Sequence, residues 1–135
     1  TEGWGTWDFN LELIPDPDKF FRMCHEFGLD VYFNDHPLDV HEGDSHFEAY
    51  VKAAGEGVEI RERAYNDLRL RMAKVDITDK RQNRAFIDTC HRHILEAGLD
   101  YWWNDGSRGQ VSATSGQLVA NHTFFKESAR NGRRG

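Results

Sequence analysis

Two stretches of the sequence nearly repeat each other, and each ends in an asparagine followed by an aspartate. Gly28–Asp35 reads GLDVYFND and Gly98–Asp105 reads GLDYWWND, so the glycine, the leucine, the first aspartate and the final Asn-Asp pair are shared. In each stretch a glycine that can end a helix precedes a short apolar strand. A carboxylate at the carboxyl end of a buried strand is where α/β barrels place their chemistry. The pattern therefore predicts an enzyme site, with Asp35 and Asp105 as its first candidates.

The elements that must position these carboxylates can be read from spacing and from cap residues. Asp16 is a candidate N-cap with Pro17 in the first turn, and Thr78 or Asp79 can cap a later helix. The remaining expectations, in chain order, are a helix from Pro17 to Phe27, a strand over 29–34, a loop over 39–45, short helices near 46–54 and 58–74, a helix ending at Ala97, a strand over 99–104, a Gly/Ser loop over 106–115 and a helix over about 116–131.

This order of elements is typical of a parallel α/β fold, because each predicted strand follows a helix. Two strands cannot close a barrel, which needs about eight. We therefore expect residues 1–135 to be a single unit and a segment of a (β/α)8 TIM barrel, with about two parallel strands and their helices. The two predicted strands should be parallel neighbours, with Asp35 and Asp105 at the same end.

The charge, hydropathy and residue composition of the chain favour some classes of binding partner over others. The 17 basic and 23 acidic residues give a net charge of −6, which does not favour nucleic-acid binding. No apolar run is long enough to cross a membrane and no signal-peptide pattern is present, which slightly favours the cytoplasm. Cys24 and Cys90 lie in predicted helices and read as reduced core thiols. Aromatic residues make up 13% of the chain, which suits surfaces that stack on sugars and equally suits an aromatic core.

Several segments together resemble glycoside hydrolase family 31, the family of α-glucosidases and α-xylosidases. The matching segments are Trp7-Asp8, Pro15-Asp16-Pro17 and His25-Glu26-Phe27-Gly28 after the second barrel strand, Asn34-Asp35-His36-Pro37 at the end of the third, Val75–Asp79 before the next helix, Gly98–Asp105 as the fourth strand, and Asn121–Arg134 as the helix that leads to the fifth. The resemblance covers nearly all of this chain and about the middle of a family barrel.

The resemblance implies a retaining α-glycosidase with Asp105 as its nucleophile and Trp103, two residues earlier, as a wall of the sugar pocket. Asp35 and His36 are expected to bind sugar hydroxyls. The family's acid/base aspartate follows the sixth strand, beyond Gly135, so the isolated chain is expected to be inactive and to need the rest of the barrel, in cis or as another chain. The resemblance implies a carbohydrate substrate, no cofactor and no metal.

Other interpretations of the same residues stay open. Asp105 and Asp35 are also suited to cap the loops that follow them, and His36 to a structural role. The family pattern after the nucleophile is commonly Met-Asn-Glu, whereas Gly106-Ser107-Arg108 stands here, which bears on the substrate rather than on the chemistry. One rival function is a non-catalytic sugar-binding fragment. Another is a metal-dependent hydrolase that uses a local cluster of possible ligands, namely His36, Asp39, His41, Asp44 and His46.

Overall fold

The first helix begins at the predicted cap. The computed structural model describes residues 5–65, 68–105 and 113–129. In it α1 (Pro17–Glu26) starts after Asp16, whose side chain accepts a hydrogen bond from the backbone N–H of Lys19 at 2.8 Å. Gly28, just past the end of α1, has a φ of +72°, a conformation that glycine adopts without strain. The chain then turns into the first strand.

The two predicted strands form and pair as expected. β1 (Tyr32–Asp35) and β5 (Tyr101–Asn104) are parallel neighbours, with Tyr32 opposite Tyr101 and Asp35 opposite Asn104. The prediction of adjacent parallel strands is confirmed. The structure therefore establishes a mixed α/β fold that contains a parallel pair of strands. This is the general α/β part of the predicted fold class, without the barrel.

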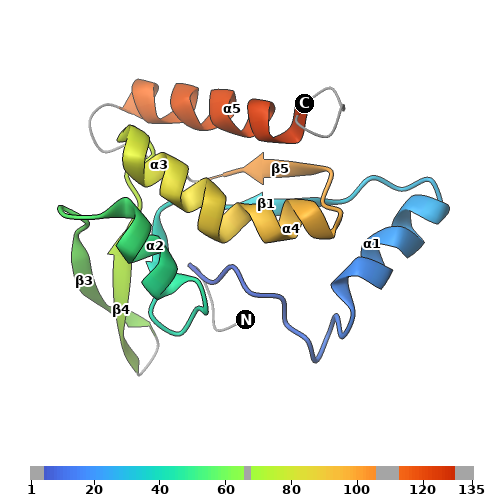
Figure 1. Cartoon of the computed structure of the whole chain (residues 1–135), viewed down its shortest axis with the longest axis horizontal. Helices are drawn as coiled ribbons and strands as arrows, with labels where there is room; N and C mark the ends of the chain where they lie inside the picture. Colours follow the sequence, from blue (N-terminus) through green and yellow to red (C-terminus); the bar gives the residue numbers. More distant parts are fainter. Residues whose placement is uncertain (1–4, 66–67, 106–112, 130–135) are drawn as a thin grey trace.

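One continuous helical run covers a face of this parallel pair. It consists of α3 (Lys80–Phe86), a π-helical turn η1 (Ile87–His91) and α4 (Arg92–Ala97). Figure 1 shows the run in yellow and orange in front of β1 and β5. Asp79 caps it through hydrogen bonds from two backbone N–H groups of its first turn, and Gly98, with a φ of +130°, ends it.

A small antiparallel sheet was not predicted. Its strands are β2 (Asp39–His41), β3 (Ile60–Tyr65) and β4 (Leu68–Lys74), in the order β2-β4-β3. The predicted helix over 58–74 is therefore wrong, and so is the loop over 39–45 in its first residues. Arg69 and Arg71 of β4 alternate with Leu68, Leu70 and Met72 at a period of two, which is the period of a strand rather than of a helix.

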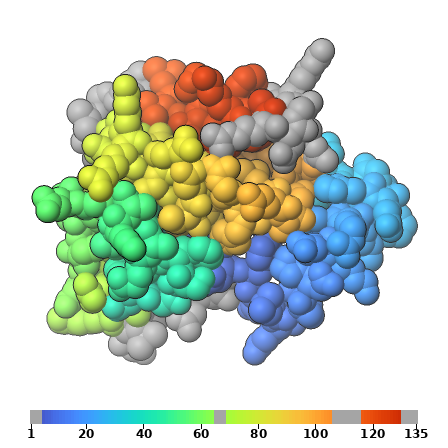
Figure 2. Space-filling view, viewed as in Figure 1, coloured from blue at the N-terminus to red at the C-terminus, as the bar shows by residue number. Residues whose placement is uncertain are grey.

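Two further helices complete the described structure. α2 (Phe47–Ala54) confirms the helix predicted near 46–54 and packs against α3, and α5 (Ala113–Ala129) lies along β5. Figure 1 shows α5 above the strands, the β3–β4 hairpin at one end and α1 at the other. The space-filling view shows the dark blue N-terminal segment seated between the α1 and α2 regions (Figure 2). Its Trp7 belongs to the hydrophobic core.

Candidate active site

The carboxyl ends of β1 and β5 lie side by side and carry the predicted site residues. The backbone N–H of Asp105 donates a hydrogen bond to the carbonyl oxygen of Asp35 at 2.8 Å, which extends the ladder by one step beyond the paired residues. Asp35 and Asp105 are thus at the same end of the parallel pair, as predicted. Of the loop predicted over 106–115, residues 106–112 lie outside the described residues, and residues 113–115 are wrong as a loop because they begin α5 (Ala113–Ala129).

Alternation along the strands divides the candidates between two faces. Paired residues of parallel strands point to the same side, so Phe33 and Trp102 share the face that packs against the helices. Trp103 points to the other side and is 55% exposed. The same alternation places Asp105 with Trp103, and its side chain is 52% exposed. An aromatic ring and an accessible carboxylate therefore share the open face of the strands.

His36 is brought next to Asp105. Its Nε2 lies 3.8 Å from Oδ2 of Asp105, within reach of an ion pair but beyond a hydrogen bond. The His36 side chain is 19% exposed, and the residue follows directly on the end of β1. The ring can donate a proton to a nearby oxygen or hold a cationic charge beside the carboxylate. Of the four predicted site residues, Asp105, Trp103 and His36 are thus gathered at one strand end.

Asp35 is placed differently from its prediction. Its side chain is completely buried, and its Oδ2 lies 3.2 Å from Nε2 of His91, which is also completely buried. The carboxylate therefore faces the helical layer rather than the open face of Trp103. This position weighs against a direct contact between Asp35 and a sugar.

His91 is a residue that the sequence patterns did not single out for the site. It is the last residue of the π-helical turn η1, and its ring stacks on Trp102 with centroids 4.0 Å apart. Its side chain and that of its neighbour Cys90 are both fully buried. Burial raises the pKa of the Cys90 thiol, and both cysteines are free, as predicted.

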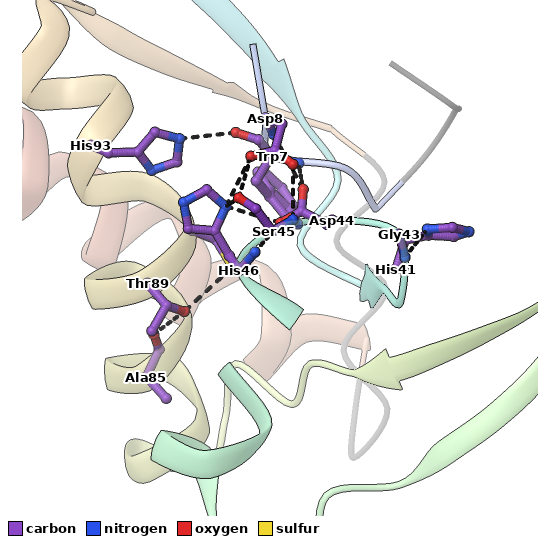
Figure 3. A network of polar contacts seen from close by, with 11 residues as sticks. Trp7, Asp8, His41, Gly43, Asp44, Ser45, His46, Ala85, Thr89 and His93 are labelled. Atoms are coloured by element: carbon purple, nitrogen blue, oxygen red, sulfur yellow. Dashed lines mark hydrogen bonds and ion pairs between the residues drawn. The ribbon is translucent and has the colours of Figure 1, made fainter. Parts of the chain in front are cut away.

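A second polar cluster joins the N-terminal segment to the loop before α2. His46 Nδ1 lies 2.9 Å from Asp44 Oδ1 and 3.4 Å from Asp8 Oδ1, and the three side chains point toward one another in Figure 3. Ser45 donates from its hydroxyl to Asp8 at 2.6 Å. Among the described residues these three offer ligand atoms close enough to hold a metal ion.

Hydrogen bonds already occupy the Asp44 carboxylate. Its Oδ2 accepts from the backbone N–H groups of Trp7 and Asp8, and its Oδ1 accepts from the backbone N–H of His46 at 2.8 Å. Burial raises the pKa of Asp44, but the hydrogen bonds from His46 and from the Trp7 backbone outweigh it and hold the pKa below its usual value. The hydrogen bond to Asp44 in turn raises the pKa of His46, against the opposing effect of burial.

His93 completes this cluster from the helical side. Its ring stacks on His46 with centroids 4.2 Å apart, and its Nε2 lies 3.0 Å from the carbonyl oxygen of Trp7 (Figure 3). Burial, with the charge of His46, lowers the pKa of His93. The pKa values of the two stacked rings are therefore shifted in opposite directions, which makes His46 the more readily protonated of the two.

The five-residue ligand cluster suggested by the sequence does not assemble as a whole. Asp39 is held by Arg61, whose NH2 group donates to both carboxylate oxygens at 2.7 and 2.8 Å. His41 accepts from the backbone N–H of Gly43 at its Nδ1. Only Asp44 and His46 come together, and their partner is Asp8, a residue the sequence pattern did not include.

Comparisons with known proteins leave the family open. No family model matches the chain, and no significant match is found among curated proteins. Within residues 5–65, 68–105 and 113–129, no helix is both long and apolar enough to cross a bilayer.

Proposed function

We propose that this chain carries the nucleophile of a retaining α-glycosidase, Asp105, in a barrel that is completed in cis or by another chain. The observation that carries the proposal is the pairing of an accessible carboxylate with an exposed indole at the carboxyl end of adjacent parallel strands. This is the end of an α/β barrel where catalytic groups are found. The resemblance of Gly98–Asp105 to the nucleophile strand of glycoside hydrolase family 31 supports it.

In the proposed reaction a carboxylate oxygen of Asp105 attacks the anomeric carbon while the glycosidic bond breaks. A second carboxyl group, about 5–5.5 Å away, gives its proton to the leaving oxygen. Water, deprotonated by that same group, then hydrolyses the glycosyl ester on Asp105. Two inversions leave the configuration at the anomeric carbon unchanged. In the family pattern the second carboxyl group follows a later strand, so the remaining barrel is the partner this proposal requires.

Trp103 and His36 are suited to hold the sugar around the nucleophile. The indole is exposed two residues before Asp105, where its face can stack on a sugar ring and exclude water. His36 can donate to a sugar hydroxyl, or keep the carboxylate in place while the charge on the sugar develops. The direct sugar contact that the sequence suggested for Asp35 is not part of the proposal, because that side chain is fully buried.

The metal-dependent alternative rests on Asp8, Asp44 and His46. A metal ion there would have to displace the contact of His46 with Asp44 Oδ1, whose lone pairs already accept from His46. The hydrogen bonds of Asp8, Asp44 and His46 already join the N-terminal segment to the loop before α2 without a metal ion. We therefore favour the glycosidase over the metal-dependent hydrolase.

The proposal is tested by chemical rescue in protein that holds the complete barrel. Asp105→Ala should lose hydrolysis of aryl α-glycosides, because no covalent intermediate can form. Azide should enter the space left by the carboxylate, attack the same carbon and restore turnover, with a β-glycosyl azide as product. His36→Ala is the matched control, because it keeps the nucleophile and should yield no azide product. Full activity of Asp105→Ala without azide would refute the proposal, as would rescue of the control alone.

A further inference from the structure

The completely buried pair of Asp35 and His91 is not used by the proposed chemistry. Oδ2 of Asp35 and Nε2 of His91 are 3.2 Å apart, but the pair is not aligned as a hydrogen bond. Within the described residues, neither carboxylate oxygen and neither ring nitrogen has a hydrogen-bond partner. Each group therefore depends on the other to offset the free-energy cost of its own desolvation.

The surroundings of the pair are aromatic. The His91 ring stacks on Trp102 at 4.0 Å and contacts Trp7, Phe86 and Phe124, with centroids 4.5–5.2 Å away. A buried ion pair in apolar surroundings is a weak source of stability, because desolvation offsets the attraction, and apolar residues of similar volume often serve as well. Stability alone thus gives no reason for a carboxylate and an imidazole at this place.

The position of Asp35 in the chain offers a reason. Its carbonyl oxygen accepts the hydrogen bond from the Asp105 N–H at 2.8 Å, and the next residue, His36, reaches Asp105 with its side chain. The Asp35–His36 peptide therefore contacts both the backbone and the carboxylate of the proposed nucleophile. An interaction that holds Asp35 in place therefore also holds its hydrogen bond from the Asp105 N–H and the contact of His36 with the Asp105 carboxylate.

The helix is locally adapted to bring His91 to this strand end. His91 closes the π-helical turn η1, and the insertion of such a turn changes the direction of the side chains that follow it. His91, at the end of this turn, lies in the core beside β1, whereas His93 is only half-buried and stacks on His46. Such turns are frequent at functional sites.

We propose that Asp35 and His91 are positioning residues, whose buried contact fixes the end of β1 and through it the backbone and carboxylate of Asp105. This inference rests on the proposed function for the role of Asp105. It replaces the direct sugar contact expected for Asp35 with an action through the neighbouring strand.

The chain provides a matched control. His25 Nε2 and Asp100 Oδ2 lie 3.0 Å apart, and the Asp100 side chain is also completely buried, but this pair lies at the opposite end of the two strands. Asp100→Asn removes another fully buried carboxylate, whose Oδ2 accepts from the backbone N–H of Val31 at 2.6 Å, without touching the strand end that bears Asp105. Any effect common to both variants reports general destabilisation, and an effect of Asp35→Asn alone reports positioning.

The first measurement is hydrogen–deuterium exchange of the chain, followed by mass spectrometry on peptides that end at Asn104 and at Asp105, whose difference reports the Asp105 amide. We expect Asp35→Asn to speed exchange at the Asp105 amide about tenfold beyond the change in global stability, and Asp100→Asn to leave that difference unchanged. The double variant Asp35→Asn/His91→Phe, which has no titratable group at either position, should regain stability but keep the fast exchange. Equal exchange at Asp105 in the Asp35 and Asp100 variants would overturn the inference.

The second measurement separates this inference from the proposed function. In the complete barrel, Asp35→Asn should lower kcat for aryl α-glycosides about tenfold or more with little change in KM, because a misplaced nucleophile slows the chemical step. The Asp100→Asn enzyme should keep the wild-type kcat at temperatures where it is folded. If the wild-type enzyme forms no glycosyl ester on Asp105 but exchange at Asp105 still depends on Asp35, the proposed function fails and the positioning of Asp105 stands. Equal kcat in both variants would overturn the positioning role.

Discussion

Asp105 differs from every other carboxylate near the strand ends because it is accessible, lies beside an exposed indole and has an imidazole within 3.8 Å. Asp35, by contrast, is enclosed. These two aspartates have the same place in a near repeat, but Asp35 is paired with Asn104 rather than with Asp105. The one-residue offset of the strand register therefore decides which of the two carboxylates is exposed.

The first prediction concerns this accessible carboxylate. Asp105→Asn is isosteric, so the fold should be retained, but the amide cannot form the covalent intermediate. We expect kcat of the complete enzyme to fall at least about a thousandfold. Steady-state kinetics with an aryl α-glycoside, together with an unchanged thermal transition, would check it. Turnover within a few-fold of the wild type would rule out Asp105 as nucleophile.

The second prediction concerns His46, whose pKa is raised by its hydrogen bond to Asp44. Asp44 and Asp8 face the ring with negative charge, and His93 stacks on it. Because the folded-state pKa of His46 lies above its unfolded value, its stabilisation is complete below about pH 6.5 and is lost as the pH rises through the folded pKa. The stability difference between wild type and His46→Gln should therefore be about 1 kcal/mol larger at about pH 6 than at about pH 8.

Urea unfolding of both proteins at the two pH values measures this difference directly. The free energy of unfolding of the variant is subtracted from that of the wild type at each pH. This subtraction removes the contributions that the two proteins share, among them those of the acidic residues outside the cluster. His93, whose pKa is lowered by burial, loses stabilisation as the pH falls, so His93→Gln is a useful companion variant. A stability difference that grows from pH 6 to pH 8 would contradict the assigned state of His46.

At the scale of elements, two helix ends with the same sequence signal differ in their packing. Gly28 and Gly98 both have positive φ, but a Cβ on Gly28 would meet nothing within 4 Å, whereas one on Gly98 would lie 2.7 Å from the Cβ of Phe21. We expect Gly28→Ala to cost about 1 kcal/mol from backbone strain alone and Gly98→Ala about 3 kcal/mol or more. Denaturant unfolding with circular dichroism tests this, and equal costs would show that the close approach at Gly98 does not matter.

The elements that the sequence predicted well are those with strong local signals. Asp16 with Pro17 marks the start of α1, and the repeat ending at Asp35 and Asp105 marks the parallel pair. The β3–β4 hairpin was missed because its apolar residues, considered without the charged ones, also fit the spacing of a helix. Its charged residues form ion pairs across the two strands, such as Arg69 of β4 with Glu62 of β3 at 3.6 Å, which only the pairing reveals.

The site was predicted only in part, for a related reason. The proximity of Asp105, Trp103 and His36 follows from two neighbouring strand ends, which the near repeat indicates. The pairing of Asp35 with His91 depends on a π-helical turn, and the contact of Asp8 with His46 joins residues 38 positions apart in the chain. Neither of these contacts leaves a periodic signal in the sequence.

At the scale of the whole molecule, the face of the strands opposite the helical layer is left open in the described residues. Leu29, Tyr32 and Trp103 are 55–57% exposed, and the Tyr32 and Trp103 rings are 6.2 Å apart. Parallel sheets are normally covered on both faces and continue at their edges. This open aromatic face is where the proposed remainder of the barrel would pack.

We expect this open face to cause self-association of the isolated chain. Uncovered strand edges and an apolar face favour contact with a second copy. Sedimentation velocity should show oligomers whose fraction rises with concentration, and Trp103→Ser should reduce it. Leu118→Ser, which removes a 65% exposed side chain on α5, is the control and should leave association unchanged. A monomer with a sharp cooperative melt at all concentrations would show that the chain is complete without further strands.

The central claim is that Asp105 forms a covalent bond to the anomeric carbon of an α-glycoside. A fluorinated α-glycosyl fluoride, which forms a glycosyl ester that hydrolyses slowly, can trap this intermediate in protein containing the complete barrel. Peptide mass spectrometry should then find one sugar attached to the peptide containing Asp105, with none in the Asp105→Asn variant. The absence of any adduct in an enzyme that the compound inactivates, or an adduct on another residue such as Asp8, would contradict the claim.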